Sequence, residues 1–361
     1  MEPEPRETGT KVAMILAAGL GTRLSPLTRE RPKPLVEVLG TPLIHFALRN
    51  ALNAGAERIA INTHHLHPAV EEALGDAFEG VPLTFSYEPV ILGTGGGVRG
   101  MAERLSGVSS SFLLLNADAL IDLDTAAMVA LHRARAPTAT LALKDVPGKE
   151  RFGLIGTDDD DRVRTFAGRT RFAGPVAKER MFCGVHVIEP PLLERLPLGE
   201  ESCINQIGYP PLLDEGALVL GFDVPGYFCD VGTPERLLEA NLRLLSGEVA
   251  LSHLDPFARF DKRDEGAGAT YVANGARVDG ALVPPVLIDE GAVIEVGARV
   301  GPLAVVGKGC RVGANAVVEK AVLQSGAEVD PGCEVRGAVL GARCRLDIDP
   351  ALVAALEGRG G

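Results

Sequence analysis

Hydrophobic residues follow two alternating patterns between residues 12 and 135. Strands are predicted in four places, 12–16, 58–62, 83–87 and 112–115, of which the first and the last are continuous apolar runs typical of buried parallel strands. Between and after them, apolar residues recur at helical spacing in four segments: 41–55, 68–74, 98–105 and 125–135. This alternation predicts an α/β fold in which a Rossmann-like, mostly parallel sheet is covered by helices on both faces.

A different period begins near residue 271. Aliphatic residues return every six positions with small residues, chiefly glycine, between them: Ile288, Ile294, Val300, Val306, Val312 and Val318. Val272 and Val278 precede this series, and five residues continue it with two slips of one position: Leu323, Val329, Val335, Leu340 and Leu346. The period predicts a parallel β-helix, in which each aliphatic side chain stacks on its equivalent in the next coil.

A polar stretch rich in Asp, Arg and Gly separates the two patterns. We therefore predict an α/β domain at 1–246, a linker at 247–270, a β-helix at 271–346 and a tail at 347–361. The repeat contains no histidine, which acyl-transferring β-helices need as a base, so a structural, effector-binding or self-associating role is favoured.

Composition narrows the function. The net charge of −12, with no basic cluster, argues against a nucleic-acid surface. No apolar run reaches the length that spans a bilayer, and the acidic first ten residues do not resemble a signal peptide. The six cysteines form no C-x-x-C pair, which favours reduced thiols. We expect a cytoplasmic protein that does not engage membranes.

The run from Leu16 to Leu35 carries the strongest chemical signal. A buried strand leads into small residues, which let backbone N–H groups approach phosphate: Ala17, Ala18, Gly19, Gly21 and Thr22. Arg23 adds a forked cationic donor, and two flanking prolines present Lys33 from a stiff segment. The dinucleotide fingerprint fails at Leu24, and no Gly-Lys-Ser/Thr follows, so neither common nucleotide loop applies.

Two aspartates are candidate metal ligands. Asp118 directly follows the buried run at 112–115, and Asp230 precedes a glycine turn and a proline-started helix. An aspartate after a strand is also a common turn or cap residue. Because Mg²⁺ takes one or two protein carboxylates together with phosphate oxygens, this pair would suffice for it.

The compound pattern G-x-G-x-R-L-x-P-L-T-x-x-x-P-K-P-L, which contains Gly19, Gly21, Arg23 and Lys33, resembles the signature of the sugar-1-phosphate nucleotidyltransferases. The resemblance implies that residues 16–22 hold a nucleoside triphosphate. It further implies that Arg23 contacts the departing pyrophosphate, that Lys33 contacts the reacting phosphates, and that Asp118 and Asp230 bind Mg²⁺.

Other matches to this family concern the base and the sugar. Glu88 and Gly93 match positions that fit around the base, and Gly153 and Gly184 match positions close to the sugar. One departure is the missing Glu-Lys-Pro motif, whose lysine contacts the sugar phosphate; residues 163–169 read VRTFAGR, and Arg169 is a candidate replacement. The four aspartates at 158–161 are expected to form a solvated hairpin tip.

The resemblance implies an enzyme that makes a nucleotide sugar and pyrophosphate from a nucleoside triphosphate and a sugar 1-phosphate, without a covalent nucleophile. GTP and mannose 1-phosphate are favoured, because the repeat resembles the left-handed β-helix appended to mannose-1-phosphate guanylyltransferases. Uridylyl or thymidylyl transfer to another hexose or an N-acetylated amino-sugar 1-phosphate is an alternative. A non-catalytic subunit that senses nucleotide sugars is another. A homo-oligomer formed through the β-helix is also considered.

Overall fold

The structure is a computed structural model that describes residues 10–105, 110–146, 153–167, 174–264 and 268–357. Its contacts divide the chain into two compact units. The sheet unit comprises the residues up to Leu20 and Ile44–Phe228, and the stack unit comprises Gly21–Leu43 and the chain from Cys229 onward. The two units group residues that contact one another, whereas the predicted domains are continuous stretches of the sequence. The predicted boundaries at 246/247 and 270/271 therefore stay a prediction.

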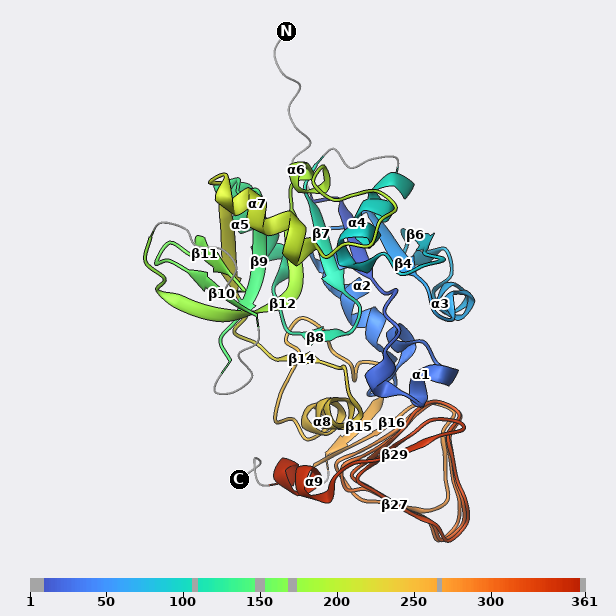
Figure 1. Ribbon diagram of the computed structural model, residues 1–361. Helices are drawn as coiled ribbons and strands as arrows, with labels where there is room; N and C mark the ends of the chain where they lie inside the picture. Colours follow the sequence, from blue (N-terminus) through green and yellow to red (C-terminus); the bar gives the residue numbers. More distant parts are fainter. Residues whose placement is uncertain (1–9, 106–109, 147–152, 168–173, 265–267, 358–361) are drawn as a thin grey trace. The chain divides into compact units, whose positions relative to one another are not determined.

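Ten strands among the described residues form the mixed sheet of the sheet unit (Figure 1). Along the main path the order is β11-β10-β12-β7-β1-β4-β6-β5, and β9 pairs with both β12 and β13. Their bounds are β1 (Val12–Leu16), β4 (Arg58–Thr63), β5 (Ala77–Phe78), β6 (Val81–Tyr87), β7 (Phe112–Asn116), β9 (Ala139–Lys144), β10 (Leu154–Thr157), β11 (Val163–Phe166), β12 (Lys178–Ile188) and β13 (Val219–Asp223). Strands β1, β4, β6 and β7 are parallel, while β12 runs antiparallel to β7 and β9.

Helices cover both faces of this sheet (Figure 1). Residues from α4 (Gly93–Arg104), α6 (Pro190–Leu193) and α7 (Tyr209–Asp214) pack with the strands into one hydrophobic core on one face. The other face carries α2 (Leu43–Asn53) and α5 (Thr125–Arg135), and α3 (His67–Leu74) follows β4 along the chain. The predicted α/β layering is confirmed.

The glycine-rich stretch at 93–97 differs from expectation. The helical pattern predicts a helix at 98–105, but α4 already begins at Gly93, so the glycines form its first part. A Cβ on Gly96 would lie 2.4 Å from the carbonyl oxygen of Glu200, and one on Gly95 would lie 2.5 Å from Ser202 Oγ. Glycine is needed here because another segment of the sheet unit packs closely against the helix.

The hairpin tip at 158–161 matches the prediction in part, since Asp159 and Asp160 are exposed. It does join β10 to β11, but Asp158 is buried rather than solvated. Its carboxylate accepts hydrogen bonds from the backbone N–H of Arg162 and from the Arg164 side chain. Burial alone would raise the pKa of Asp158, but these hydrogen bonds outweigh it and lower the pKa below its usual value.

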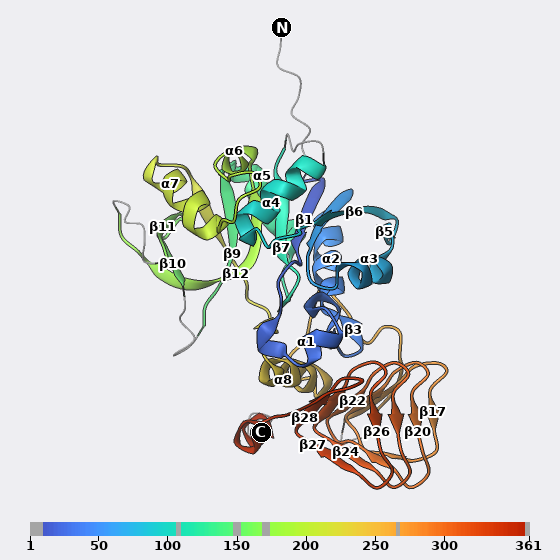
Figure 2. The same cartoon turned by 45° about the vertical axis from the view of Figure 1, so that its right-hand side comes forward.

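In the stack unit, the chain visits three parallel sheets in rotation, as Figure 2 shows along the side of the stack. The first sheet contains β16 (Ala269–Val272), β19 (Val286–Ile288), β22 (Ala304–Val306), β25 (Ala321–Leu323) and β28 (Ala338–Leu340). The second sheet contains β17 (Arg277–Val278), β20 (Val293–Ile294), β23 (Arg311–Val312) and β26 (Glu328–Val329). The third contains β18 (Ala281–Leu282), β21 (Arg299–Val300), β24 (Val317–Glu319) and β27 (Glu334–Arg336).

The strand register explains the repeat. Ile288 pairs with Val306, Val306 with Leu323, and Leu323 with Leu340, so each aliphatic residue stacks on the next and the one-residue slips are absorbed between strands. These side chains form a single buried core. Leu346 does not continue the pattern as predicted: it lies in β29 (Arg345–Asp347), which pairs antiparallel with β28 and closes the stack. At the other end, β15 (Asp261–Asp264) pairs antiparallel with β16.

The remaining elements of the stack unit flank these sheets. Residues 22–24 and 33–35 form short 3-10 turns on either side of α1 (Leu27–Glu30), and β2 (Glu37–Val38) pairs with β3 (Thr41–Pro42). Helix α8 (Pro234–Leu245) begins after Thr233, whose hydroxyl caps it, and α9 (Pro350–Glu357) ends the described chain. Within the described residues, the search for a helix long and apolar enough to cross a membrane gives none.

Candidate active site

The first turn after β1 lies at the carboxyl end of the parallel strands, where such sheets bind ligands. Ala17 and Ala18 are buried, whereas Gly19 is exposed and a Cβ there would meet nothing within 4 Å. The backbone N–H of Ala17 donates a 2.7 Å hydrogen bond to Oδ1 of Asn62, the penultimate residue of β4. The turn is therefore tied to the neighbouring parallel strand.

Glu88 belongs to the same hydrogen-bonded group in the sheet unit. Its Oε1 accepts from Asn62 Nδ2 at 2.7 Å, and its Oε2 accepts from the backbone N–H of Leu92 at 2.9 Å. The side chain is buried, and His64 Nδ1 lies 2.7 Å from the Glu88 carbonyl oxygen. Glu88 thus joins the turn after β1 to the start of α4.

The start of α4 is packed as closely as this group. Gly93 has φ +65°, and Gly95 N–H donates to the carbonyl oxygen of Ser202 at 2.8 Å. A Cβ on Gly97 would lie 2.6 Å from Asn62 Nδ2 and 2.8 Å from Glu88 Oε1. The glycines let the helix approach both the Asn62–Glu88 group and the segment at Ser202.

The sugar-side candidates also lie in the sheet unit. Gly184 has φ +74°, and a Cβ on it would stand 2.5 Å from Nδ2 of Asn116, the last residue of β7. Asp118 is half-buried in the turn between β7 and β8 (Ala119–Ile121). Gly153, with φ +65°, is exposed and has open space around it. Gly184 therefore lies next to Asn116 in space, and Asp118 is two residues after it in the sequence. Gly153 has no such neighbour in the described structure.

Two buried side chains next to Gly184, those of Cys183 and His186, are uncharged at neutral pH. Burial raises the pKa of the Cys183 thiol to about 12 despite the opposing charge of Lys144, so this thiol stays protonated at neutral pH. Burial lowers the pKa of His186 to about 3, so its ring is neutral. Neither residue is suited to be a nucleophile or a fixed cation.

The stack unit contains the charged candidates. Gly21 adopts the left-handed conformation (φ 62°), and a Cβ there would lie 2.9 Å from Cβ of Lys33. The carbonyl oxygen of Gly21 accepts a hydrogen bond from the Thr28 hydroxyl. Glycine is required at this position both by the backbone conformation and by the lysine packed against it. Thr22 begins the 3-10 turn that carries Arg23.

Arg23, Lys33 and Asp230 come together within this unit. Asp230 Oδ2 lies 3.8 Å from Arg23 Nη2, and Oδ1 lies 3.9 Å from Lys33 Nζ. The Arg23 side chain is 65% exposed and Asp230 is 46% exposed, whereas the Lys33 side chain is only 8% exposed. A Cβ on Gly232 would lie 2.6 Å from Arg23 Nη2. The glycine in the turn after Asp230 therefore lets the Arg23 guanidinium approach Asp230.

This charged cluster suits a polyphosphate and a hard cation. Arg23 and Lys33 can offset the negative charge of phosphate groups. Because their ion pairs with Asp230 are long, at 3.8 and 3.9 Å, the Asp230 oxygens can also coordinate a metal ion. The search for groups of three or more His, Cys, Asp or Glu that could hold a metal gives none in the described parts of the chain. A magnesium ion held by one or two carboxylates and substrate oxygens needs no such group.

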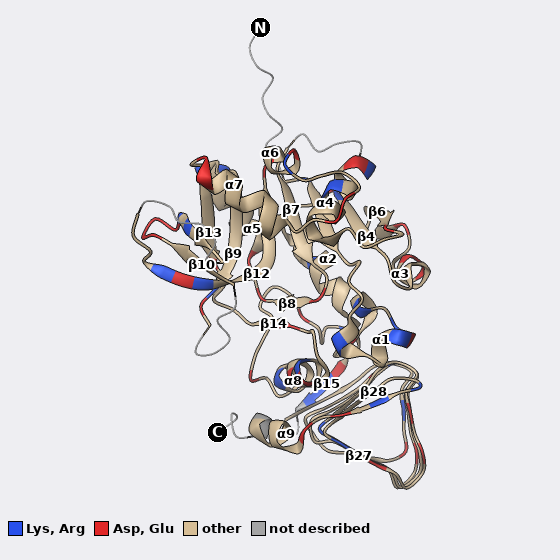
Figure 3. Cartoon of the chain, viewed as in Figure 1, with Lys and Arg blue, Asp and Glu red and all other residues tan. Residues whose placement is uncertain are grey.

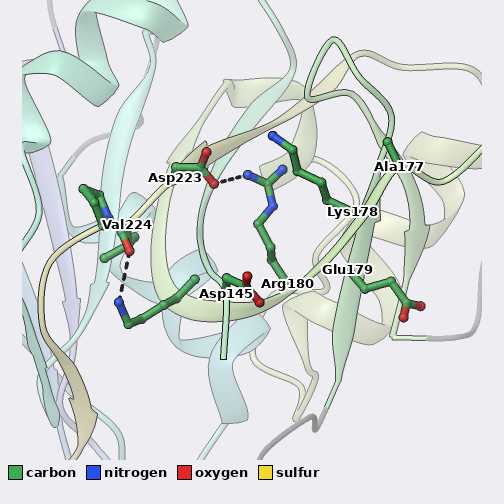
Figure 4. A pocket seen from close by; sticks show the side chains of 9 residues that line it. Asp145, Ala177, Lys178, Glu179, Arg180, Asp223 and Val224 are labelled. Carbon is green, nitrogen blue, oxygen red and sulfur yellow. Dashed lines mark hydrogen bonds and ion pairs between the residues drawn. The ribbon is translucent and has the colours of Figure 1, made fainter. Parts of the chain in front are cut away.

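A cleft of about 610 Å³ lies beyond the carboxyl ends of β9 and β13 in the sheet unit (Figure 4). Lys144 Nζ donates to the carbonyl oxygens of Val224 and Gly226, and Arg180 binds Asp223, Asp161 and Thr157. Figure 3 shows basic and acidic residues that alternate along the start of β12. None of the predicted site residues lines it; its lining is Lys144, Asp145, Ala177, Lys178, Glu179, Arg180, Asp223, Val224 and Pro225. Arg169, the predicted substitute for the missing lysine, lies outside the described residues.

Comparison with known protein families decides the relationship. Residues 12–247 match the nucleotidyl transferase model, and residues 282–351 match the model of the GMPPB C-terminal domain. The chain belongs to the sugar-1-phosphate nucleotidyltransferase family. It is therefore one of a family of enzymes, as its opening motif indicated.

Relatives of this nucleotidyltransferase differ in the base that their names specify. A mannose-1-phosphate guanylyltransferase of Mycobacterium tuberculosis is 31% identical over 325 residues, covering 90% of this chain and 82% of the relative. A UTP–glucose-1-phosphate uridylyltransferase of Synechocystis sp. is 28% identical over 335 residues (90% and 85%). A glucose-1-phosphate adenylyltransferase of Bacillus cereus is 29% identical over 358 residues (90% and 94%).

The sequence reasoning missed Asn62, Ser202 and Asn205. Asn62 ends the buried run RIAIN, and a polar residue at the carboxyl end of a parallel strand is the signal that could have found it. Ser202 Oγ and Asn205 Oδ1 are buried without a hydrogen-bond partner in the described structure, and Ser202 lies beside the start of α4. Nothing in the local sequence pattern distinguishes these two residues, because only the packing of α4 brings them there.

Proposed function

We propose that this nucleotidyltransferase joins a nucleoside monophosphate to a sugar 1-phosphate. A phosphate oxygen of the sugar 1-phosphate attacks the α-phosphorus of the triphosphate in line. The bond from that phosphorus to the bridging oxygen breaks, and pyrophosphate leaves with the bonding electron pair. Alignment and charge neutralisation are the protein's tasks in such a transfer, and no protein nucleophile takes part.

The cluster of Arg23, Lys33 and Asp230 is the observation that carries this proposal. It sets two cations around one carboxylate, with the lysine ammonium largely shielded from water. We assign Arg23 to the charge on the departing pyrophosphate and Lys33 to the reacting phosphates. A shielded ammonium stabilises developing phosphate charge more strongly than one in water does.

Asp118 and Asp230 are the proposed ligands of Mg²⁺. Their hard carboxylate oxygens suit this ion, and Asp230 keeps nearly half of its surface exposed. When bound, the ion supplies positive charge to phosphate oxygens. The side chains of Arg23 and Lys33 supply charge that does not depend on it.

The turn after β1 and the segment before α4 are proposed to hold the rest of the substrates. Residues 16–22 and the Glu88–Gly93 segment would bind the nucleotide, with Asn62 fixing the turn that contains Ala17. Gly153, which has open space around it, and Gly184, which lies against Asn116, are proposed to be close to the sugar. Backbone N–H groups in a glycine-rich turn bind phosphate without adding charge.

GTP and mannose 1-phosphate are the proposed substrates. Support comes from residues 282–351, which match the GMPPB C-terminal domain, and from the M. tuberculosis relative. A uridylyl or thymidylyl transferase is the second candidate, because the Synechocystis relative carries the name of a uridylyltransferase.

We further propose that the strand stack is a left-handed β-helix through which the protein self-associates. Three parallel sheets visited in rotation, seen as a triangle in Figure 1, are the architecture of such a helix. Light scattering of the full chain tests the self-association: a monomer at all concentrations would contradict it.

A substrate panel tests the activity. Four nucleoside triphosphates are combined with mannose, glucose and N-acetylglucosamine 1-phosphates, and pyrophosphate release is measured with and without Mg²⁺. Fastest release with GTP and mannose 1-phosphate is expected, and another preferred pair would identify the alternative. Tight nucleotide-sugar binding without turnover in any combination would instead identify a sensing subunit.

A further inference from the structure

One corner of the strand stack holds the segment that carries Arg23 and Lys33. The corner follows the first of the three sheets, where Ile288, Val306, Leu323 and Leu340 are in register. The next residues in the chain therefore occupy equivalent positions on successive coils: Asp289, Gly307, Gln324 and Gly341. Glycine is the residue at two of these positions, whereas the other two carry buried polar side chains.

Gln324 binds the backbone of Glu37. Its Oε1 accepts from the Glu37 N–H at 2.8 Å, and its Nε2 donates to the Glu37 carbonyl oxygen at 2.9 Å. The glutamine, only 1% exposed, thus pairs with both polar groups of one residue, much as a neighbouring strand would. Glu37 lies four residues after Lys33, and the backbone between them is tightened by the hydrogen bond from Val36 N–H to the Lys33 carbonyl oxygen.

The Glu37 side chain is held at the same place. Its carboxylate accepts from the backbone N–H of Ser325 at 3.0 Å and from the Ser325 hydroxyl at 2.7 and 2.9 Å. Arg31 bridges the two segments, since it donates to Glu37 Oε1 at 2.5 Å and to the carbonyl oxygen of Ser325 at 3.0 Å. Charge-assisted hydrogen bonds to a buried carboxylate are among the stronger ones and orient both partners.

The corner also contacts the segment on either side of Glu37. At one end, Asp289 binds Arg259, whose Nη2 donates to the carbonyl oxygen of Gly40 at 3.0 Å. At the other end, a Cβ on Gly341 would lie 2.9 Å from Leu27 Cδ1 and 3.0 Å from Glu30 Oε1. Three coils thus contact three successive parts of residues 27–40, through Gly341, Gln324 and Asp289 in turn.

From this juxtaposition we propose that Gln324, Ser325 and Asp289 are positioning residues for the phosphate-handling segment. They fix the backbone that presents Lys33 and Arg23, and so give the strand stack a part in catalysis without contacting substrate. The proposal rests on the assignment of Lys33 and Arg23 to the reacting phosphates. At this corner, Asp289 and Gln324 replace the glycine found at positions 307 and 341, and their side chains fix the segment.

Gln324→Gly is the sharpest variant, because glycine is the native residue at the equivalent positions 307 and 341. The stack is therefore expected to fold with glycine at this corner. A displacement near 1 Å of groups around the reacting centre costs roughly 100-fold in rate. We expect pyrophosphate release by Gln324→Gly to fall roughly 10- to 100-fold in kcat, with a smaller change in KM for the triphosphate.

Hydrogen exchange supplies a readout that does not depend on activity. The amides of Leu35 and Val36, which are hydrogen-bonded within the segment, should exchange roughly tenfold faster in Gln324→Gly. The amides of Val293 and Gly307, hydrogen-bonded within the stack, should keep their wild-type rates. Lys308→Gln, which breaks an exposed ion pair with Glu290 on the stack, is the matched control and should change neither kcat nor exchange.

Wild-type kcat and wild-type exchange at residues 35–36 in Gln324→Gly would overturn the proposal. So would faster exchange throughout the stack, because the loss of rate would then come from a loosened stack. If the wild-type protein itself has no turnover with any substrate pair, the proposed function fails. The exchange rates at residues 35–36 then still decide whether Gln324 fixes the segment.

Discussion

The two halves of the opening motif are built in different ways. The half from Leu16 to Gly19 belongs to the sheet unit, where buried, mostly neutral groups bind one another through Asn62 and Glu88. The half from Gly21 to Leu35 belongs to the stack unit, where its cations flank a carboxylate that is nearly half exposed. One continuous motif thus contributes a buried, hydrogen-bonded turn to one unit and charged side chains to the other.

This difference separates what the two halves contribute. A network of buried hydrogen bonds is costly to break, because each group left unpaired keeps its full desolvation penalty. Substitutions in the half from Leu16 to Gly19 and in its partner Asn62, together called the neutral half below, should therefore lower both the stability of the protein and its binding of the nucleotide. The Arg23–Asp230 pair is exposed, and exposed ion pairs contribute about 0 to 1 kcal/mol to folding, so a substitution of Arg23 should affect catalysis alone. Substitutions in each half test this separation.

The largest effect is expected in the charged half. Arg23→Ala should lower kcat for pyrophosphate release by roughly 100- to 1,000-fold, because it removes a preorganised donor from the developing charge. The free energy of unfolding should change by less than about 1 kcal/mol, because the Arg23–Asp230 pair is long and exposed. Chemical denaturation measures the second quantity. A large loss of stability would show that the two halves are not built differently.

An intermediate effect is expected in the neutral half. Asn62→Ala removes the acceptor for the Ala17 N–H and the donor to Glu88, which leaves two buried groups unpaired. The free energy of unfolding should fall by about 1–3 kcal/mol for each such group, and kcat/KM for the triphosphate should fall as well. Glu79→Gln, which breaks an exposed ion pair with Arg49, is the control and should leave both unchanged. Unchanged stability in Asn62→Ala would contradict the account of this half.

Much of this comparison could be predicted from the sequence, for identifiable reasons. The charged half is predictable because Arg23 and Lys33 carry their chemistry in their side chains and because the prolines around Lys33 restrict its backbone. The parallel sheets of the stack are predictable because a six-residue period keeps the same side chain in the core on every coil. These signals are local or strictly periodic.

The rest depends on contacts that the local sequence pattern does not reveal. Asp158 has the same local sequence as a solvated turn residue, and only the approach of Arg164 shows that it is buried and bonded. Likewise, Gln324 resembles any polar residue between two strands until Glu37 is seen against it. The division of the motif between Leu20 and Gly21 has no local signal either, because it reflects how the chain folds back on itself.

The smallest and most selective test compares two glycines of α4. Alanine in place of glycine within a helix stabilises by up to about 1 kcal/mol where space permits. At Gly100 the nearest atom to a new Cβ, Ser86 Oγ, is 3.7 Å away, so Gly100→Ala should raise the free energy of unfolding and leave KM for the triphosphate unchanged. At Gly97 the Cβ would press on Asn62 and Glu88, so Gly97→Ala should lower stability and raise KM, as thermal melts and kinetics would measure. If both alanines stabilised the protein equally, the neutral half would be loosely packed, and its proposed role in holding the nucleotide would lose its basis.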